Sequence, residues 1–225
     1  GAMLKIAISG KGGVGKTTLA GVMARILSRS GRRVLAIDAD PDSNLASAIG
    51  FSPEDLIQVK PLSLMEEFIA ERTGAKKGTY GSFFKLNPKV DDIPDRFSLD
   101  RDGIKLVILG NVARGGTGCL CAENVLLKTF LSYVLIERDE VVIVDMEAGL
   151  EHLGRGTAEY VDGLIVVVEP GRRSFQTARD VERLGADLGI RRVYVVANKV
   201  TGEDDLALIR GSLPTMNVLG FLSYS

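Results

Sequence analysis

The sequence is poor in cysteine, in net charge and in long apolar runs. Its two cysteines in 225 residues are too few for the disulfide framework of a secreted domain, so we expect a cytoplasmic protein. The formal net charge is −1 at pH 7, which argues against a general nucleic-acid binder. No apolar run approaches the roughly 20 residues that cross a bilayer, and we recognise no signal peptide. Neither nucleic acid nor membrane is therefore expected as a partner.

The length suits one well-filled α/β domain covering residues 1–225, and we find no linker that would divide it. Gly1–Met3 resemble a remnant of cloning and are left out of the fold prediction. The last predicted strand begins near Leu219 and runs into a loop, and we expect a further C-terminal helix to follow it.

A glycine-rich segment, Gly10–Thr18, lies between an apolar strand (4–8) and an amphipathic helix (19–27). It matches the G-x-x-x-x-G-K-[ST] pattern of a phosphate-binding loop, and we call it the phosphate loop. Glycines let backbone N–H groups converge on phosphate, and the helix N-terminus adds positive potential. Lys16 is expected to reach the β- and γ-phosphates and Thr17 to hold Mg²⁺. The residues predicted to bind nucleotide here are Gly12, Gly13, Val14, Gly15, Lys16, Thr17 and Thr18.

Carboxylates follow two of the predicted buried strands. The strand 32–38 ends in Asp38-Ala39-Asp40-Pro41-Asp42, and the strand 141–144 is followed by Asp145. Ligands of open α/β sheets bind at this carboxyl edge. Asp145 is expected to hold Mg²⁺ through water, as in a Walker B motif. We expect Asp42 to cap a short helix over residues 43–49.

Both cysteines of the chain, Cys119 and Cys121, lie between a predicted strand (104–109) and a predicted helix (123–136). A helix N-terminus favours thiolate over thiol, and thiolates bind metals or take part in redox chemistry. Two thiolates supply half of a four-coordinate site, which a two-fold dimer would complete with four sulfurs. Such a site suits Zn²⁺ or Ni²⁺. Two buried structural cysteines are the alternative.

The last predicted buried strand (193–197) runs into Asn198-Lys199-Val200-Thr201. Guanine-specific GTPases carry an aspartate at the position of Thr201, so adenine is favoured here. Asn198 is expected to pair with adenine, and Lys199 to stack on it through its aliphatic stem.

The string KGGVGKTT resembles the deviant phosphate loop of the MinD/ParA-type ATPases. This resemblance implies an ATP-dependent homodimer in which Lys11 contacts the nucleotide of the partner subunit. The stretch D-x-D-P implies that Asp40 orients the attacking water and that Asp38 lies near Mg²⁺ through its water shell. The spacing D-x-x-x-G implies that Gly149 is a switch residue sensing the γ-phosphate. Glu147 departs from the small residue that this switch pattern carries. The resemblance assigns catalytic roles to Lys11, Lys16 and Asp40.

The runs GGTGCLCAEN, DADPDSNL, LNPKV and EHLGRGTAEYVD resemble the nickel-insertion ATPases of carbon monoxide dehydrogenase maturation, the CooC type. This resemblance covers most of the chain and implies that Cys119 and Cys121 bind nickel between subunits. The second cysteine region of the nitrogenase iron protein and the C-x-x-C of iron–sulfur scaffold proteins are both absent.

The predicted fold is a doubly wound, mostly parallel sheet of seven to eight strands with helices on both faces, a P-loop NTPase. The predicted function is an ATPase, with ATP/ADP and Mg²⁺ as ligands, that delivers Ni²⁺ or Zn²⁺ to carbon monoxide dehydrogenase or acetyl-CoA synthase. A ParA/MinD-type positioning ATPase and an iron–sulfur electron-transfer ATPase are the alternatives. His152 is expected at a helix start as a surface or capping residue, with a metal role as the alternative. Residues 53–102 are expected to form an insertion with a helix at 62–69 and a loop at 73–82.

Overall fold

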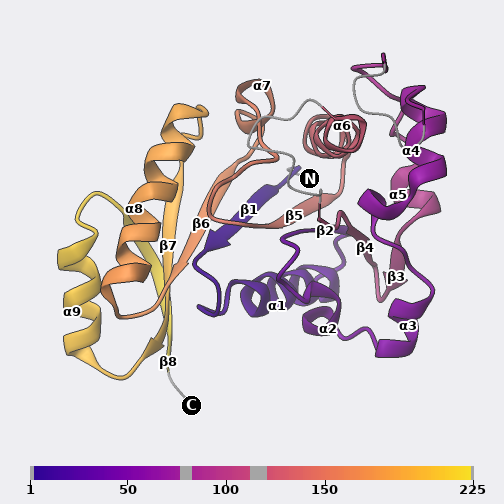
Figure 1. Ribbon diagram of the computed structural model, residues 1–225. Helices are drawn as coiled ribbons and strands as arrows, with labels where there is room; N and C mark the ends of the chain where they lie inside the picture. Colours follow the sequence, from indigo (N-terminus) through magenta and orange to yellow (C-terminus); the bar gives the residue numbers. More distant parts are fainter. Residues whose placement is uncertain (1–2, 77–82, 112–120, 224–225) are drawn as a thin grey trace.

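The computed structural model describes residues 3–76, 83–111 and 121–223. Within these residues the strands form a sheet of eight strands in the order β3-β4-β2-β5-β1-β6-β7-β8, with helices on both faces (Figure 1). All neighbouring strands pair in parallel except β3 and β4, which form an antiparallel hairpin. The predicted doubly wound, mostly parallel sheet is confirmed.

The strands are short, and the central ones are wholly buried. Their bounds are β1 (Lys5–Gly10), β2 (Val34–Ala39), β3 (Leu99–Arg101), β4 (Ile104–Ile108), β5 (Val141–Met146), β6 (Gly163–Val168), β7 (Val193–Val200) and β8 (Asn217–Ser223). Every residue of β1, β2, β5 and β6 is buried, as their continuous apolar sequences predict for parallel strands covered on both faces.

The helices alternate with these strands. Their bounds are α1 (Lys16–Arg29), α2 (Leu45–Ile49), α3 (Pro53–Ile57), α4 (Glu66–Thr73), α5 (Ile93–Arg96), α6 (Ala122–Ile136), α7 (Arg155–Ala158), α8 (Arg172–Asp187) and α9 (Glu203–Ser212), with a 3₁₀ turn over Leu62–Leu64. In the described parts of the chain, no helix is long and apolar enough to cross a membrane.

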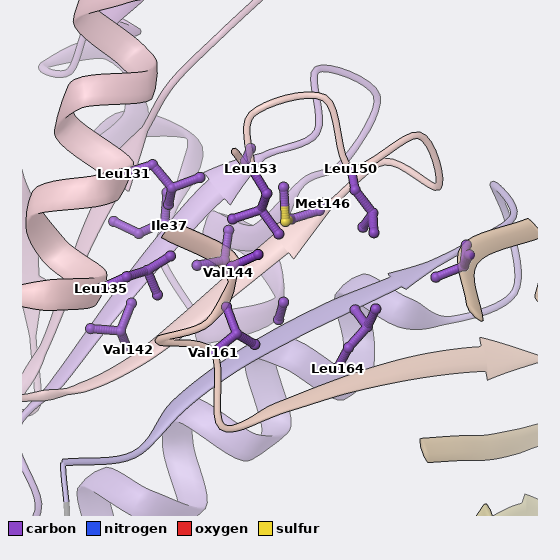
Figure 2. Close-up of a cluster of buried hydrophobic side chains, with 14 of the residues drawn as sticks. Ile37, Leu131, Leu135, Val142, Val144, Met146, Leu150, Leu153, Val161 and Leu164 are labelled. Atoms are coloured by element: carbon purple, nitrogen blue, oxygen red, sulfur yellow. The ribbon is translucent and has the colours of Figure 1, made fainter. Parts of the chain in front are cut away.

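Two apolar clusters fill the space on either side of the sheet. One lies between the sheet and the helices α1 and α2, and the other lies under α4, α6, α8 and α9. Figure 2 shows part of the second cluster, where Leu131 and Leu135 of α6 meet Val144 of β5. Leu150 and Leu153, from the turn that follows β5, are buried in the same cluster. The turn after β5 is therefore packed into the core that α6 covers.

A buried lysine fixes the C-terminal end of α6. Lys5 of β1 donates from Nζ to the carbonyl oxygens of Val134 at 3.1 Å and Glu140 at 3.3 Å, and also to that of Arg138. Burial lowers the pKa of this ammonium group, and the neighbouring Glu140 opposes that shift. Val134 lies in the last turn of α6, where carbonyl groups lack intrahelical partners, so Lys5 supplies a donor there and also binds the segment that follows the helix.

Two predicted helix starts are wrong. The helix predicted from residue 43 begins at Leu45, and its cap is Asn44, whose side chain accepts a hydrogen bond from the Ser47 N–H. Asp42 is not the cap, because it lies two residues before Asn44, in a tight turn where its backbone N–H donates to the carboxylate of Asp40 at 2.9 Å. The helix expected at residue 151 begins at Arg155. Residues 147–154 form turns instead, and Leu150 has a φ of +51°.

The insertion at 53–102 is more structured than predicted. It contains α3, α4, α5 and the edge strand β3, and part of the loop expected at 73–82 lies outside the described residues. A bidentate ion pair joins Arg72 of α4 to Asp92, with N–O distances of 2.7 and 2.6 Å. The Arg72 guanidinium also lies 4.6 Å from the centre of the Phe68 ring. The ion pair holds α4 against the segment that leads into α5, whereas the ring contact lies within α4 itself.

Candidate functional site

The phosphate loop connects β1 to α1 at the carboxyl edge of the sheet. Gly13 and Gly15 have φ angles of +82° and +99°, which favour glycine. Gly12 and Gly13 are exposed, whereas Val14 is buried and anchors the loop in the apolar cluster under α1. Thr18 is exposed in the first turn of α1. The loop thus combines an exposed glycine backbone with a fixed apolar anchor, as a phosphate cradle requires.

Lys16 lies at the centre of a buried charge network. Its Nζ is 2.6 Å from Oδ1 of Asp145 and 2.6 Å from Oδ2 of Asp40. Burial acts to lower the pKa of this ammonium group, but Asp145 and Asp40 outweigh burial and raise it. Lys16 therefore remains protonated, and it links the phosphate loop to the ends of β2 and β5.

Asp38 lies beside Asp145, since the two are register partners on β2 and β5. Burial, together with the neighbouring Asp145, raises the pKa of Asp38 to about 6, although a hydrogen bond from Ser43 opposes the shift. Ser43 donates from Oγ to Oδ1 of Asp38 at 2.8 Å, and the N–H of Asp40 donates to the same oxygen at 3.2 Å. These two donors fix the orientation of the Asp38 carboxylate.

The residues predicted to hold Mg²⁺ are brought together. Thr17 donates from Oγ1 to Oδ2 of Asp145 at 2.8 Å, and Asp38 adjoins Asp145 across the strand pair. Hydroxyl and carboxylate oxygens are the donors that Mg²⁺ prefers. The donor set of Thr17, Asp38 and Asp145 therefore fits this ion.

Asn198 and Lys199, at the end of β7, contact the phosphate loop from behind. Asn198 donates from Nδ2 to the carbonyl oxygen of Val14 at 2.8 Å. Lys199 donates from Nζ to the carbonyl oxygen of Gly13 at 2.8 Å and to Oε2 of Glu169 at 2.7 Å. Both side chains thus brace the loop, a role that the sequence did not suggest. Their contacts with adenine stay a prediction.

The segment predicted to be a switch is joined to β1 just before the phosphate loop. Ser9 is fully buried and donates from Oγ to the carbonyl oxygen of Glu147 at 3.1 Å. Gly149 is exposed in the following turn, and the buried Leu150 has a φ of +51°. A leucine in this backbone region costs on the order of 1–3 kcal/mol, and such strain is concentrated at functional segments. The switch role of Gly149 stays a prediction.

Glu147 belongs to a group of carboxylates beside the Lys16 network. One carboxylate oxygen each from Glu147, Asp40 and Asp42 lie within 4.8 Å of one another. Asp40 is buried, Glu147 is half-buried and Asp42 is exposed. Glu147 and Asp42 therefore add negative charge beside Asp40.

Lys11 is half-buried in the phosphate loop, and its carbonyl oxygen accepts a hydrogen bond from the Val14 N–H at 3.4 Å. Among the described residues its side chain takes part in no ion pair, unlike Lys16. The predicted contact with a partner's nucleotide stays a prediction. That contact requires an ammonium group that is not already paired with a carboxylate of the described residues.

Cys121 lies at the N-cap of α6 and is half-buried. Its position at a helix N-terminus agrees with the prediction, and such a position lowers the pKa of a thiol. Cys119 lies outside the described residues. Metal binding by Cys119 and Cys121 therefore stays a prediction.

His152, the single histidine, is half-buried in the turn before α7. Burial lowers its pKa, the nearby Lys128 of α6 lowers it further, and Glu151 opposes the shift. The imidazole is thus neutral at pH 7. Its electrostatic interaction with Lys128 places the turn after β5 close to α6.

Residues 5–225 match the CobQ/CobB/MinD/ParA nucleotide binding domain. The chain belongs to this family. A member of the CobQ/CobB/MinD/ParA family with this phosphate loop is an ATPase, and the predicted enzyme class and nucleotide binding are confirmed.

Two relatives match this family member over nearly its whole length. It is 50% identical over 221 residues to the carbon monoxide dehydrogenase accessory protein CooC of Rhodospirillum rubrum, a match covering 98% of this chain and 84% of CooC. It is 46% identical over 224 residues to an uncharacterized ATP-binding protein of Methanocaldococcus jannaschii, covering 98% and 85% of the two chains. The predicted resemblance to CooC-type proteins is confirmed.

Solved structures of the same family share the fold. A ParA family ATPase of Chlorobium tepidum has a TM-score of 0.67 at 17% identity, covering 99% of this chain and 84% of that one. MinD in the MinC:MinD complex of Aquifex aeolicus has a TM-score of 0.65 at 18% identity, covering 98% and 81%. At these identities the likeness concerns the fold alone.

Three residues of the site were missed by sequence reasoning: Ser9, Ser43 and Glu169. Glu169 directly follows β6, so the rule that placed Asp38 and Asp145 at the carboxyl edge applies to it as well. Ser43 follows the D-x-D-P turn that brings its hydroxyl back to Asp38. Ser9 carries no sequence signal of its own, because its partner is a backbone carbonyl group.

Proposed function

We propose that this ATPase is a metallochaperone that carries a soft divalent metal, nickel or zinc, between two subunits and delivers it to carbon monoxide dehydrogenase or acetyl-CoA synthase. The observation that carries the proposal is the 50% identity, over 98% of the chain, to a carbon monoxide dehydrogenase accessory protein. The position of Cys121 at the N-terminus of α6 supports it, because thiolates there suit a soft metal.

The ATP step begins at Lys16. Its ammonium group is shared between Asp40 and Asp145 at 2.6 Å each, so the β- and γ-phosphates of ATP compete with two carboxylates for one cation. We expect Lys16 to turn from Asp40 toward the γ-phosphate, which leaves the Asp40 carboxylate to accept a hydrogen bond from the attacking water.

Thr17, Asp38 and Asp145 would hold Mg²⁺ together with the phosphates. When bound, this ion supplies positive charge that neutralises the phosphate oxygens. Ser43 and the Asp40 N–H keep the Asp38 carboxylate oriented throughout. Lys11 is assigned to the partner's nucleotide, where a cation supplied in trans stabilises the transition state as an arginine finger does.

Nucleotide and metal sites are linked through the turn after β5. Gly149 lies in this turn, and the adjoining Leu150 and Leu153 are buried in the cluster that α6 covers (Figure 2). Cys121 lies at the start of α6. A displacement of Gly149 on ATP binding would therefore be transmitted to α6 and would change the distance between the cysteine pairs of two subunits.

The experiment is a measurement of metal content per chain, by elemental analysis after anaerobic loading with nickel or zinc. We expect about half an ion per chain for the wild type, as a site shared by two subunits requires. The Cys119→Ala/Cys121→Ala variant lacks every thiol of the chain and should retain no metal, while its affinity for ATP is unchanged.

His152→Ala is the matched control, since it removes the single imidazole of the chain, another group that suits nickel or zinc, and should keep the metal. Light scattering on the same samples measures the molar mass and so shows whether the protein is a dimer. A full ion per chain in a monomer, or metal retained without either cysteine, contradicts a shared thiolate site. A visible iron–sulfur absorption band would favour the electron-transfer alternative.

A further inference from the structure

We propose a second binding site, for a small anion carrying phosphate or carboxylate groups, in a cavity at the end of α1 farthest from the phosphate loop. The cavity has a volume of about 230 Å³ and lies where α1, α2 and the β3–β4 hairpin meet. We call it the distal cavity. The residues that line it are Arg25, Ser28, Arg29, Ile49, Gly50, Arg101, Asp102 and Ile104.

The distal cavity carries an excess of positive charge. Three of its lining residues are arginines, Arg25 and Arg29 from α1 and Arg101 from β3, against the single carboxylate of Asp102. Asp102 is 3.6 Å from Nε of Arg101, and both side chains are largely exposed, so this ion pair is weak. Within the described residues, Arg25 and Arg29 form no ion pair. Two guanidinium groups are thus available to an anion.

The walls of the distal cavity are held together independently of any ligand. Ser28 donates from Oγ to the carbonyl oxygen of Asp102, which joins α1 to the hairpin turn. Asp102 and Gly103 form that turn, with φ angles of +51° and +80°. Gly50 ends α2 on the opposite side, where an added Cβ would meet only Arg101, at 3.9 Å. The arginines are therefore presented from preformed elements, which lowers the entropic cost of binding.

Size and position define the ligand. A volume of about 230 Å³ is below the roughly 300 Å³ of pockets for drug-sized molecules, so the ligand is a small anion. The 14 residues of α1 span about 20 Å, which is too far for a phosphate group held in the phosphate loop to reach. Arginine forks bind phosphate and carboxylate in the same bidentate way, so both chemistries fit.

A competing explanation is that the arginines only balance the negative ends of α1 and α2. Arg29 does lie in the last turn of α1. However, the N–H groups of Ser30, Gly31 and Gly50 already bond the terminal carbonyl groups of these helices. Arg101 belongs to the edge strand β3, which among the described strands pairs only with β4, and not to either helix. Charge balance at helix ends therefore does not account for all three cations.

The test is isothermal titration calorimetry with inorganic phosphate and, separately, succinate. The protein is first saturated with Mg²⁺ and a non-hydrolysable ATP analogue, which fills the phosphate loop. We expect one anion to bind per chain, with an affinity that falls as the salt concentration is raised. Tighter binding of phosphate or of succinate shows whether the cavity prefers a phosphate or a carboxylate group. Arg25→Gln/Arg101→Gln should weaken binding about tenfold or more, since two charge-assisted hydrogen-bonding groups are lost.

Arg33→Gln/Arg183→Gln is the matched control, because it removes the same charge from two exposed arginines that pair with surface carboxylates. Binding in this variant should change by less than about twofold. Equal weakening in both double variants, or no heat with either probe, would overturn the proposal. If Arg25→Gln/Arg101→Gln fails to fold, the single variant Arg29→Gln is measured instead. An unchanged affinity for the anion in Arg29→Gln would also overturn the proposal.

Discussion

Asn198 of β7 donates from Nδ2 to the carbonyl oxygen of Val14 at 2.8 Å, across 184 positions of the sequence. A Cβ at Gly15 would lie 2.3 Å from that nitrogen, so the glycine is required for the contact. The end of β7 and the phosphate loop are therefore joined directly. Two side-chain contacts make this connection, one from the Asn198 amide group and one from the Lys199 ammonium group.

The first prediction concerns this amide. Asn198→Ala removes a half-buried hydrogen bond of about 0.5–1.5 kcal/mol and leaves the Val14 carbonyl group without its donor, so we expect the Kd for ADP to rise about three- to tenfold. Fluorescence titration with a labelled ADP measures it. Asn217→Ala, at an exposed position of β8, is the control and should bind normally. Equal affinities in the two variants would show that the loop does not depend on Asn198.

The second prediction concerns Asp145, which is wholly buried and contacts both Lys16 and Thr17. Asp145→Asn should reduce ATP hydrolysis about 100-fold or more and lower the free energy of unfolding by about 3 kcal/mol, since Lys16 loses a buried counter-charge. Phosphate release and urea denaturation measure the two effects. Asp187→Asn, at an exposed position, is the control and should alter neither quantity. Full ATPase activity in Asp145→Asn would show that Asp145 is not needed at the site.

The third prediction uses the single histidine, whose NMR signal needs no assignment. Burial and Lys128 lower the pKa of His152 below 6.5, so the unfolded chain binds a proton at a higher pH than the native protein does. The free energy of unfolding should therefore decrease as the pH falls below 6.5. A proton–carbon NMR titration of the imidazole gives the native pKa directly.

Two variants test the causes of the lowered pKa of His152. Lys128→Gln should raise the pKa of His152 and Glu151→Gln should lower it, because each removes one charge that acts on the imidazole. Shifts of the opposite sign would contradict the position of the turn after β5 beside α6.

The fourth prediction compares two helical glycines. A Cβ at Gly21 of α1 would lie 2.7 Å from the backbone carbon of Ala48, so Gly21→Ala should separate α1 from α2 and cost about 1–3 kcal/mol. At Gly211 of α9, apart from its chain neighbours and its own helix backbone, no atom of the described residues lies within 4 Å of such a Cβ, so Gly211→Ala should stabilise the protein by about 0.5–1 kcal/mol. Chemical denaturation measures both, and the same sign in both variants would contradict the close helix contact.

The central fold and the position of the catalytic edge could be predicted because they depend on local patterns. Apolar runs identified β1, β2 and β5, and a carboxylate at the end of a run placed Asp38 and Asp145 at one edge. The glycine spacing placed Lys16 at the start of α1. These signals lie within a few residues of each other, so tertiary structure does not alter them.

The rest depends on contacts between distant segments. Asn44 caps α2 instead of Asp42, because α2 begins at Leu45, after a turn in which the Asp42 N–H is bonded to Asp40. Asp40 is in turn paired with the distant Lys16. The strand β3 is three residues long and depends on β4 for its hydrogen bonds. Glu169 acquires its role only through Lys199, 30 positions later. No local pattern reports such partners.

The anchoring of α6 by Lys5 has a mechanical consequence. The helix is 15 residues long, or about 22 Å, and the Val134 carbonyl group in its last turn is tied to Lys5 of β1, while Cys121 lies at the other end. Any tilt of α6 then pivots at Lys5, and the displacement grows along the helix until it is greatest at the cysteine. A tilt of about 5° moves that end by about 2 Å, comparable to the length of one metal–sulfur bond.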